Sequence, residues 1–210
     1  MRQLVIIGAG GYGRELFGAA RESVGYGTDY EIRGFLDGDA AALEGHGGYP
    51  PVIGSPETYV PGSDDVFIAA LGNLASRRRC VAMIAARGGR FATIVHRSAS
   101  LGPNAVVGEG SFIAQNAVVS ADARIGRHTA VFQGSVVGHD ATVGDYSHVY
   151  SHCSIGGAVR VGSGVSVYPG AVVVPRRTIG DGAVVGAGST VVLNVKDGET
   201  VFGSPAKPVR

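Results

Sequence analysis

From residue 95 to residue 191, an aliphatic residue stands at every sixth position of the chain without a miss. The seventeen positions are Val95, Leu101, Val107, Ile113, Val119, Ile125, Val131, Val137, Val143, Val149, Ile155, Val161, Val167, Val173, Ile179, Val185 and Val191. The next residue is often Gly, and the residue four positions after the aliphatic is usually small. A period of six fits neither a helix nor an alternating strand, but it fits a short strand and a turn that form one side of a coil.

Three such sides, or 18 residues, complete one turn of a triangular prism. The pattern therefore predicts a left-handed parallel β-helix of five to six coils over residues 93–210, an exception to the right-handed crossover rule. The aliphatic residues stack in columns inside the prism, and the small residues and glycines occupy its corners. Because no repeat is interrupted, we expect no large loop to project from it.

Residues 1–92 carry a different pattern. The segment "QLVIIGAGGYGREL" predicts a buried strand, a glycine turn with Gly8, Gly10 and Gly13, and a helix that continues to about Ser23. Such a turn lets the backbone approach a phosphate, which the helix N-terminus can bind. A dinucleotide site would need a second mononucleotide-binding half, and the chain has no room for one before the β-helix begins.

Two further strands are expected before residue 92. The segment "EIRGFLDGD" predicts a strand that ends in Asp37, and "DDVFIAALGN" predicts one that ends at Gly72 and Asn73, followed by a helix in "LASRRRCVAMIAARG". These elements predict a small Rossmann-like α/β domain, which binds ligands beyond the carboxyl ends of its strands.

Composition narrows the classes of partner. With 45% apolar residues and a net charge of +1, the chain can bury a core and shows no strongly basic surface, so nucleic acid and anionic lipid are disfavoured as partners. No signal peptide or membrane span is predicted, and we expect a cytoplasmic protein. Cys80 and Cys153 lie far apart without a CxxC spacing and are expected to be free buried thiols.

The order of motifs is more specific than any one of them. "GAGGYG", "FLDGD", "ALGN", "GHDATVGDYSHV" and a closing "VFGSPAKPV" together resemble the bacterial nucleotide-4-amino-sugar N-acetyltransferases and their sialic acid O-acetyltransferase relatives. The resemblance implies a homotrimer in polysaccharide biosynthesis. It also implies acetyl-CoA in the cleft between neighbouring β-helices and a nucleotide sugar held by residues 1–92.

His139 and Asp140 are the candidate catalytic pair. His139 follows Gly138 at an outward position of its repeat, where the repeat itself requires no imidazole. Histidine is the natural general base for an attacking amine or hydroxyl, and a carboxylate beside it can orient the ring. The resemblance implies the same roles of base and partner, and direct attack on the thioester requires no covalent enzyme intermediate.

Acetyl-CoA is expected to contact a second set of residues. The set comprises His148, Gly157, Pro169, Gly186 and Ala187. His148 lies half a coil after His139, so the two cannot share one side of a prism, and a site that uses both must form between subunits. The resemblance places His148 near the thioester carbonyl, with backbone N–H groups near Gly157 as further donors.

The nucleotide sugar is assigned to residues of the first domain. The assigned residues are Gly10, Gly11, Tyr12, Asp37, Gly38, Gly72 and Asn73. Tyr12 stands where some relatives have a histidine that touches the sugar nucleotide. Asp37 is assigned to the nucleotide, but it has a second interpretation as a residue that only forms a turn with Gly38.

Other functions remain open from the sequence. The chain could acetylate a sugar hydroxyl instead of an amine, or it could be a scaffold that senses a sugar nucleotide without catalysis. A zinc carbonic anhydrase would use three histidines, for which His128, His148 and His152 are the candidates, but their spacing fits poorly and no metal site is expected. His152 is otherwise expected to be a surface residue, and the sequence does not distinguish UDP, GDP and dTDP sugars.

Assembly follows from the expected outward residues. An isolated prism should expose Val118, Phe132, Val136, Tyr150 and Tyr168. Such an apolar surface is more than a monomer of this size usually leaves in water. A trimer would bury it and bring the side with His139 against a neighbour's side with His148.

Overall fold

The computed structural model describes residues 1–209. The chain divides into two compact units, and the boundary between them falls between Ile94 and Val95. The sequence placed the boundary after residue 92. The first unit is a Rossmann-like α/β domain and the second is a left-handed parallel β-helix, so the predicted fold class is confirmed. Neither helix in the described part of the chain has the length and apolar character needed to cross a lipid bilayer.

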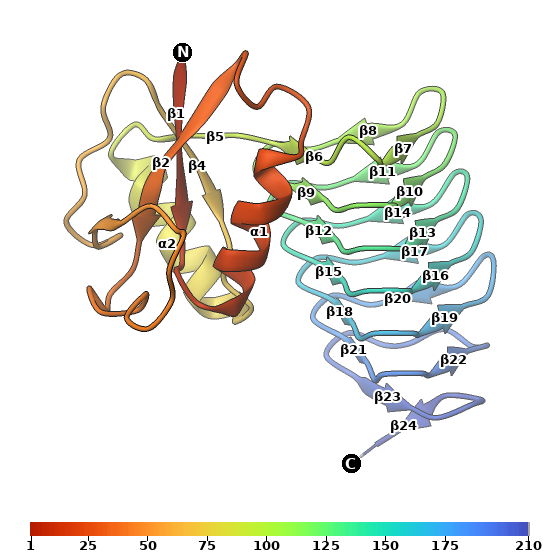
Figure 1. Cartoon of the computed structure of the whole chain (residues 1–210). Helices are drawn as coiled ribbons and strands as arrows, with labels where there is room; N and C mark the ends of the chain where they lie inside the picture. The colour runs from red at the N-terminus through yellow and green to blue at the C-terminus, as the bar shows by residue number, and fades with distance from the viewer. Residues whose placement is uncertain (210) are drawn as a thin grey trace. The chain divides into compact units, whose positions relative to one another are not determined.

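The first unit is a five-stranded parallel sheet in the order β3-β2-β1-β4-β5 (Figure 1). Its strands are β1 (Arg2–Ile7), β2 (Tyr30–Leu36), β3 (Val52–Gly54), β4 (Asp65–Ala69) and β5 (Arg90–Phe91), and its helices are α1 (Gly11–Arg21) and α2 (Leu74–Ala86). The central strand β1 pairs with β2 and β4, and its four consecutive aliphatics, Leu4 to Ile7, are fully buried, as is typical of parallel sheets with both faces covered. The short edge strands β3 and β5 were not expected from the sequence.

The ends of these elements differ from the expected positions. Helix α1 ends at Arg21, before Ser23, and β2 ends at Leu36, so Asp37 is the first residue beyond it. Strand β4 ends at Ala69, so Gly72 and Asn73 lie in the connection to α2. The apolar run "FIAAL" continues beyond the last paired residue, and so the run alone overestimates the strand.

A buried carboxylate holds the start of β4. Asp65 accepts hydrogen bonds of 2.8 Å from Arg33 Nη1, from Tyr59 Oη and from the Gly62 N–H. Burial alone would raise the pKa of Asp65, but these hydrogen bonds and the charge of Arg33 together hold its pKa below the ordinary value. Burial, with the hydrogen bond to Asp65, raises the pKa of Tyr59 to about 12.

Replacing Asp65 with Asn should lower the free energy of unfolding at neutral pH by about 1–3 kcal/mol, because buried donors lose a charged acceptor. The pKa of Asp65 is lower in the folded protein than its ordinary value of 3.8, so its ionised form stabilises the fold above that value. This stabilisation is lost as the pH falls below it. Urea unfolding should therefore show a difference between wild type and Asp65→Asn that shrinks at about pH 3; a difference independent of pH would contradict this account.

The second unit has three parallel sheets, one for each side of the prism, which we name S1, S2 and S3. S1 contains β7 (Ser100–Leu101), β10 (Val118–Val119), β13 (Val136–Val137), β16 (Ser154–Ile155), β19 (Val172–Val173) and β22 (Thr190–Val191). S2 contains β8 (Val106–Val107), β11 (Arg124–Ile125), β14 (Thr142–Val143), β17 (Arg160–Val161) and β20 (Thr178–Ile179). S3 contains β6 (Ile94–Val95), β9 (Phe112–Ile113), β12 (Ala130–Val131), β15 (His148–Val149), β18 (Ser166–Val167), β21 (Val184–Val185), β23 (Thr200–Phe202) and the antiparallel β24 (Lys207–Pro208).

Successive coils pair in register. Val118 of β10 pairs with Val136 of β13, which in turn pairs with Ser154 of β16, so equivalent residues are one 18-residue coil apart. The second residue of each strand points inward, and residues such as Val119, Val137 and Val149 are fully buried in one continuous core. Two-residue strands alternate with tight turns from β6 to β22, as Figure 1 shows, so no large loop interrupts the β-helix.

The corners of the prism are left-handed turns. Nine non-glycine residues adopt a positive φ there: Asn104, Asn116, Asp122, His128, Asp140, Tyr146, His152, Ala158 and Arg176. The left-handed region of φ and ψ costs energy for most residues, and Asn and Asp tolerate it best.

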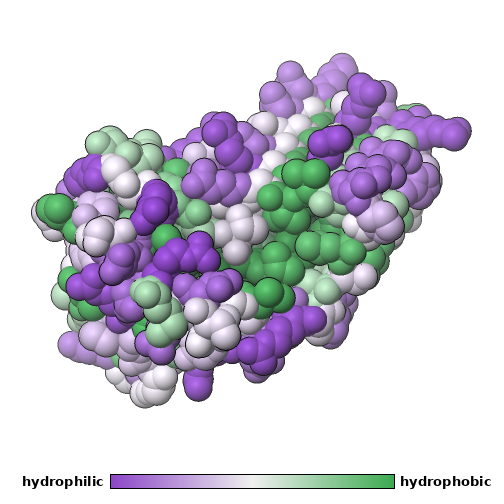
Figure 2. Space-filling model, turned by 90° about the horizontal axis from the view of Figure 1, so that it is seen from above, coloured by the Kyte–Doolittle hydropathy of each residue, from purple (hydrophilic) through white to green (hydrophobic). Residues whose placement is uncertain are grey.

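Figure 2 shows hydrophobic residues grouped on the β-helix as seen from above. Leu101 and Val106 of the first coil are exposed.

Candidate active site

His139 and Asp140 form a hydrogen-bonded pair on an outward corner of the β-helix. They occupy the turn between β13 of S1 and β14 of S2, which we call the S1–S2 corner. His139 Nδ1 lies 2.8 Å from Asp140 Oδ2, and the two side chains are 71% and 62% exposed. Asp140 has a φ of 59°, and its N–H donates to the carbonyl of Ala121, so the turn is fixed by the previous coil. With Nδ1 bonded to the carboxylate, Nε2 is the atom that can accept a proton.

Gly157 lies one coil after His139 on the same corner. A Cβ atom at Gly157 would stand 2.5 Å from His139 Nε2, so the imidazole occupies space that only a glycine leaves open. The carbonyl of His139 accepts the N–H of Ala158 at 2.8 Å. The Gly157 N–H has no acceptor among the described residues.

The other residues assigned to acetyl-CoA lie on a different corner. Pro169 follows β18, and Gly186 and Ala187 follow β21, so all three lie between S3 and S1. Sheet S1 therefore separates them from His139 and Gly157. Pro169 and Ala187 are exposed, whereas Gly186 is covered by Phe202, whose ring stands where a Cβ at Gly186 would be.

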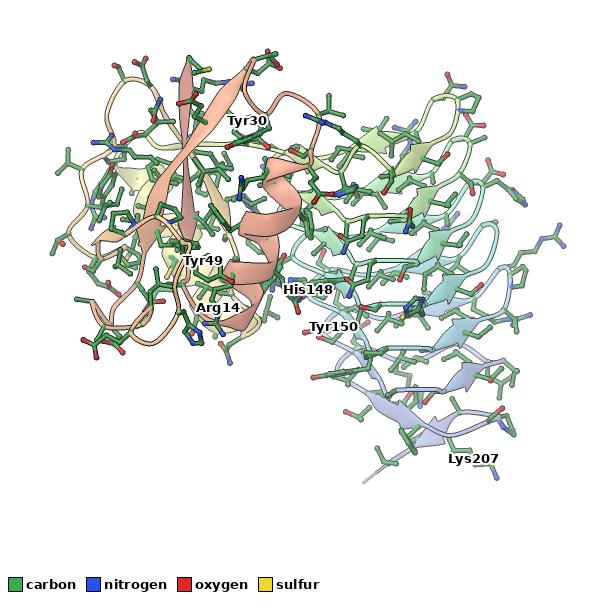
Figure 3. The ribbon with its side chains drawn as sticks, viewed as in Figure 1. Arg14, Tyr30, Tyr49, His148, Tyr150 and Lys207 are labelled. Carbon is green, nitrogen blue, oxygen red and sulfur yellow. The ribbon has the colours of Figure 1, made fainter. Side chains whose placement is uncertain are left out.

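His148 lies on β15 of S3, and only 2% of it is exposed. Its ring contacts Phe132 and Tyr150, and Nδ1 is 3.4 Å from the Tyr150 hydroxyl. Figure 3 shows His148 and Tyr150 projecting from the same part of the β-helix. Contact with a thioester would require this ring to be uncovered, so the structure does not by itself support the role expected for His148.

Three of the aromatic residues expected to point outward form a stacked column. Phe132, Tyr150 and Tyr168 stack on successive coils, with ring centroids 5.2 and 5.0 Å apart. Phe132 was expected to be exposed but is 7% exposed, because Phe112, His148 and Tyr150 pack around its ring. Val118 and Tyr150 are half-buried, and Val136 and Tyr168 are exposed as expected.

Cys153 is part of the core of the β-helix. Its thiol donates to the carbonyl of Tyr168 at 3.1 Å, and its N–H donates to Ser135 Oγ. Burial raises the pKa of Cys153 to about 11. A thiol with this pKa is protonated at neutral pH and is a poor nucleophile.

We therefore expect Cys153→Ala to retain the acetyl transfer implied by the sequence resemblance within about twofold of wild type, since a protonated, buried thiol is a poor nucleophile. In the folded protein, iodoacetamide should leave Cys153 unmodified, and unfolding should expose it. Mass spectrometry of the labelled peptides measures both states. Rapid labelling of the folded protein together with loss of activity would indicate a reactive thiol.

The glycine turn of the first unit has the shape expected of a phosphate-binding turn. Gly8 has a φ of 101°, and a Cβ at Gly13 would stand 1.9 Å from the Gly8 carbonyl oxygen, so α1 packs directly on the turn. Gly10 is the N-cap residue and has no side chain to cap the first N–H groups of α1, which belong to Gly11 and Tyr12. The N-terminus of a helix in this position can bind an anion.

A cavity of about 180 Å³ lies at the carboxyl ends of β1, β2 and β4. Of the seven substrate residues expected from the sequence, only Asp37 and Gly38 line it. Asp37 accepts the Ala9 N–H through Oδ2 at 2.8 Å and the Asp39 N–H through Oδ1 at 3.0 Å, so its carboxylate also connects β2 to the glycine turn. Both interpretations of Asp37 therefore have structural support.

Sequence reasoning missed three polar residues of this cavity, Glu57, Ser76 and Arg79. Arg79 Nη2 is 3.7 Å from Glu57 Oε1, and both side chains are largely exposed. The run Arg77-Arg78-Arg79 is the only run of three basic residues in the sequence, and it could have drawn attention to Arg79 once α2 was placed at the ends of the strands.

Gly72 and Asn73 do not line the cavity. The Asn73 side chain accepts the Ser76 N–H at 2.9 Å and caps α2, which explains an asparagine at this position without a ligand. Gly72 lies in the loop before it and has open space around it.

The three histidines considered for zinc are not brought together. His128 lies on the corner before S3, His148 on S3 itself and His152 on the corner after it. His128 stacks on Tyr146 at 4.9 Å, and a Cβ at Gly134 would meet the His152 ring at 2.6 Å. Within residues 1–209, no three His, Cys, Asp or Glu side chains are grouped as a metal site.

The chain shares its architecture, a Rossmann-like domain followed by a hexapeptide β-helix, with solved sugar acetyltransferases. Residues 3–84 match the PglD N-terminal domain family, and residues 91–185 match the GMPPB C-terminal domain family. The chain belongs to the bacterial family of nucleotide-sugar N-acetyltransferases, as its whole-length likeness to solved members shows.

Two solved structures cover the whole chain. The acetyltransferase domain of PglB from Neisseria gonorrhoeae is 31% identical, with 100% of both chains covered and a TM-score of 0.89. Perosamine N-acetyltransferase from Caulobacter crescentus, solved as a histidine-to-asparagine mutant with CoA and GDP-perosamine, is 26% identical. That match covers 100% of this chain and 98% of the other, with a TM-score of 0.89.

A curated relative matches part of the chain. UDP-N-acetylbacillosamine N-acetyltransferase of Bacillus subtilis is 34% identical over 117 residues. The match spans 54% of this chain and 51% of that enzyme, or about half of each.

Proposed function

We propose that this protein transfers an acetyl group from acetyl-CoA to the amine of a nucleotide-linked 4-amino sugar, with His139 as general base and Asp140 as its partner. One observation carries the proposal: His139 Nδ1 bonds to Asp140 at 2.8 Å, while Nε2 lies over Gly157 on an exposed corner. This is the arrangement that a base needs in order to reach a substrate.

The proposed reaction needs no reactant besides the sugar amine and acetyl-CoA. The sugar nitrogen attacks the thioester carbonyl, so a C–N bond forms, and His139 Nε2 takes the proton that the nitrogen loses. The tetrahedral intermediate then breaks its C–S bond, and the sulfur of coenzyme A leaves with the proton from His139. Asp140 stabilises the imidazolium between these steps, and we assign the Gly157 N–H, which has no acceptor among the described residues, as the donor to the oxyanion.

The first unit is proposed to hold the nucleotide. The cavity beyond β1, β2 and β4 is where open α/β sheets bind ligands, and the N-terminus of α1 beside the glycine turn suits a diphosphate. The relatives' names include both a UDP sugar and a GDP sugar, so the nucleotide is left open. Their names describe N-acetylation, which favours an amine over a hydroxyl acceptor.

We also propose that three copies assemble through their β-helices. Val136 and Val172 point outward from S1 and are 39% and 38% exposed, beside the corner that carries His139. Burying such residues against another copy is favourable. Light scattering at micromolar concentration should give about three times the chain mass of 21.3 kDa. A fully active monomer would overturn this proposal.

Coenzyme A release tests the function as a whole. The enzyme is supplied with acetyl-CoA and a panel of UDP-, GDP- and dTDP-linked 4-amino sugars, with the matching 4-hydroxy sugars as controls, and free thiol is measured. We expect release with at least one amino sugar and only background release with its hydroxyl counterpart. Tight sugar-nucleotide binding without release would instead support the scaffold hypothesis.

A further inference from the structure

Arg177 breaks the hexapeptide pattern at a position that is otherwise always small. The residue four positions after each aliphatic lies at a corner, on the side that faces the core. In all the repeats from Ala99 to Ser189 except that of Arg177, this residue is Ala, Ser, Thr, Cys or Val. Its equivalents one coil before and after are the buried Val159 and Val195. An arginine here therefore requires an explanation beyond the packing of the prism.

The Arg177 guanidinium is incompletely satisfied. Its Nε is buried and has no hydrogen-bond partner. Arg160 is its neighbour, since the Arg160 N–H donates to the Arg177 carbonyl at 2.8 Å, and Arg176 precedes it with a φ of 62°. Within the described chain, none of the three arginines forms an ion pair with a carboxylate. A buried, unpaired donor on a cation is costly, and an anion that binds there would offset this cost.

Arg176 and Arg177 lie on the corner that carries the base, and Arg160 begins β17 of S2 beside it. His139, Gly157 and Arg176 follow one another along the S1–S2 corner on successive coils, and the Arg176 N–H donates to the Gly157 carbonyl at 3.0 Å. Parallel strands stack about 4.8 Å apart, so Arg176 and Arg177 lie about 10 Å from the level of His139 along the prism. An acyl donor that reaches from Gly157 toward the C-terminal coils would pass them.

We propose that Arg160, Arg176 and Arg177 bind phosphate groups of coenzyme A and so position the thioester at His139. Coenzyme A carries its phosphates at the opposite end of the pantetheine arm from its sulfur, so the two ends need separate sites. Guanidinium groups bind phosphate oxygens through paired, charge-assisted hydrogen bonds. The inference rests on the proposed use of acetyl-CoA, but not on the identity of the acceptor.

Calorimetric titration of coenzyme A tests the site without any acceptor. Arg177→Ala should weaken coenzyme A binding about tenfold or more, and Arg176→Ala combined with it should weaken binding further. In turnover, KM for acetyl-CoA should rise while kcat stays near wild type. With S-acetylpantetheine, which lacks the adenosine phosphates, wild type and variant should react equally. Arg124→Ala, which removes an exposed arginine from β11 of the same sheet, is the matched control and should change nothing.

Thermal unfolding separates a binding defect from a folding defect. Alanine is the residue that the repeat uses at this position, so unliganded Arg177→Ala should melt at or above the temperature of wild type, and coenzyme A should stabilise it less. Unchanged coenzyme A affinity in Arg177→Ala would overturn the proposal. An altered particle mass with unchanged affinity would also overturn it, because the arginines would then pair with another copy of the chain. If coenzyme A binding depends on Arg177 but no amino sugar is acetylated, this inference stands and the proposed acceptor is wrong.

Discussion

His139→Ala is expected to lower kcat by about 10²- to 10⁴-fold, with little change in KM for acetyl-CoA. The imidazole is the group placed to accept the proton of the amine, and its Nδ1 is held by Asp140 at 2.8 Å so that Nε2 is the basic atom. Without it, the amine must lose its proton to water. The side chain is mostly exposed, so its removal should leave the β-helix intact. Steady-state coenzyme A release at saturating acetyl-CoA measures the effect.

His152→Ala provides the control for this prediction. His152 is also an exposed histidine on a corner turn, but it lies on the corner between S3 and S1, and its ring packs over Gly134. Its removal should leave kcat near wild type. Near wild-type turnover in His139→Ala, or an equal loss in both variants, would rule out His139 as the base.

Gly157→Ala is expected to lower kcat by about 10- to 100-fold. The new Cβ would stand 2.5 Å from His139 Nε2, so the exposed imidazole must turn away from its position beside Asp140. A base displaced by about 1 Å loses much of its catalytic effect. Circular dichroism should show an unchanged fold, because the backbone of Gly157 does not need the left-handed conformation.

A double-mutant cycle identifies the cause of this loss. If Gly157 acts by leaving room for the imidazole, Gly157→Ala should cost little in a chain that already carries His139→Ala. Independent, additive losses would show instead that Gly157 serves the thioester through its own N–H and not through His139.

The β-helix could be predicted almost completely from the sequence, because the same short pattern of inward aliphatic residues determines each of its sides. An inward aliphatic such as Val137 recurs once per side, and a slip of one residue would turn these side chains toward the solvent. The strand ends of the first unit were harder to predict. The apolar residues after Ala69 continue the pattern of β4, and only the absence of a pairing partner ends the strand.

The candidate site could be predicted where its functional residues are adjacent in the sequence or one coil period apart. His139 and Asp140 are neighbours, and Gly157 follows at the coil period. The burial of His148 depends on Phe132 and Tyr150, which lie elsewhere in the repeat, so the motif alone could not show it. The cavity residue Glu57 comes from the connection between β3 and β4 and Arg79 from α2, and Asn73 uses its side chain as a helix cap.

The position of the new acetyl group on the product tests the central claim most directly. Wild-type enzyme is incubated with acetyl-CoA and the nucleotide 4-amino sugar that gives the fastest coenzyme A release, and the purified product is examined by NMR and mass spectrometry. The account predicts one added acetyl group, present as an amide on the sugar nitrogen, and none with His139→Ala over the same time. An acetyl ester on a hydroxyl with the amine still free would contradict it.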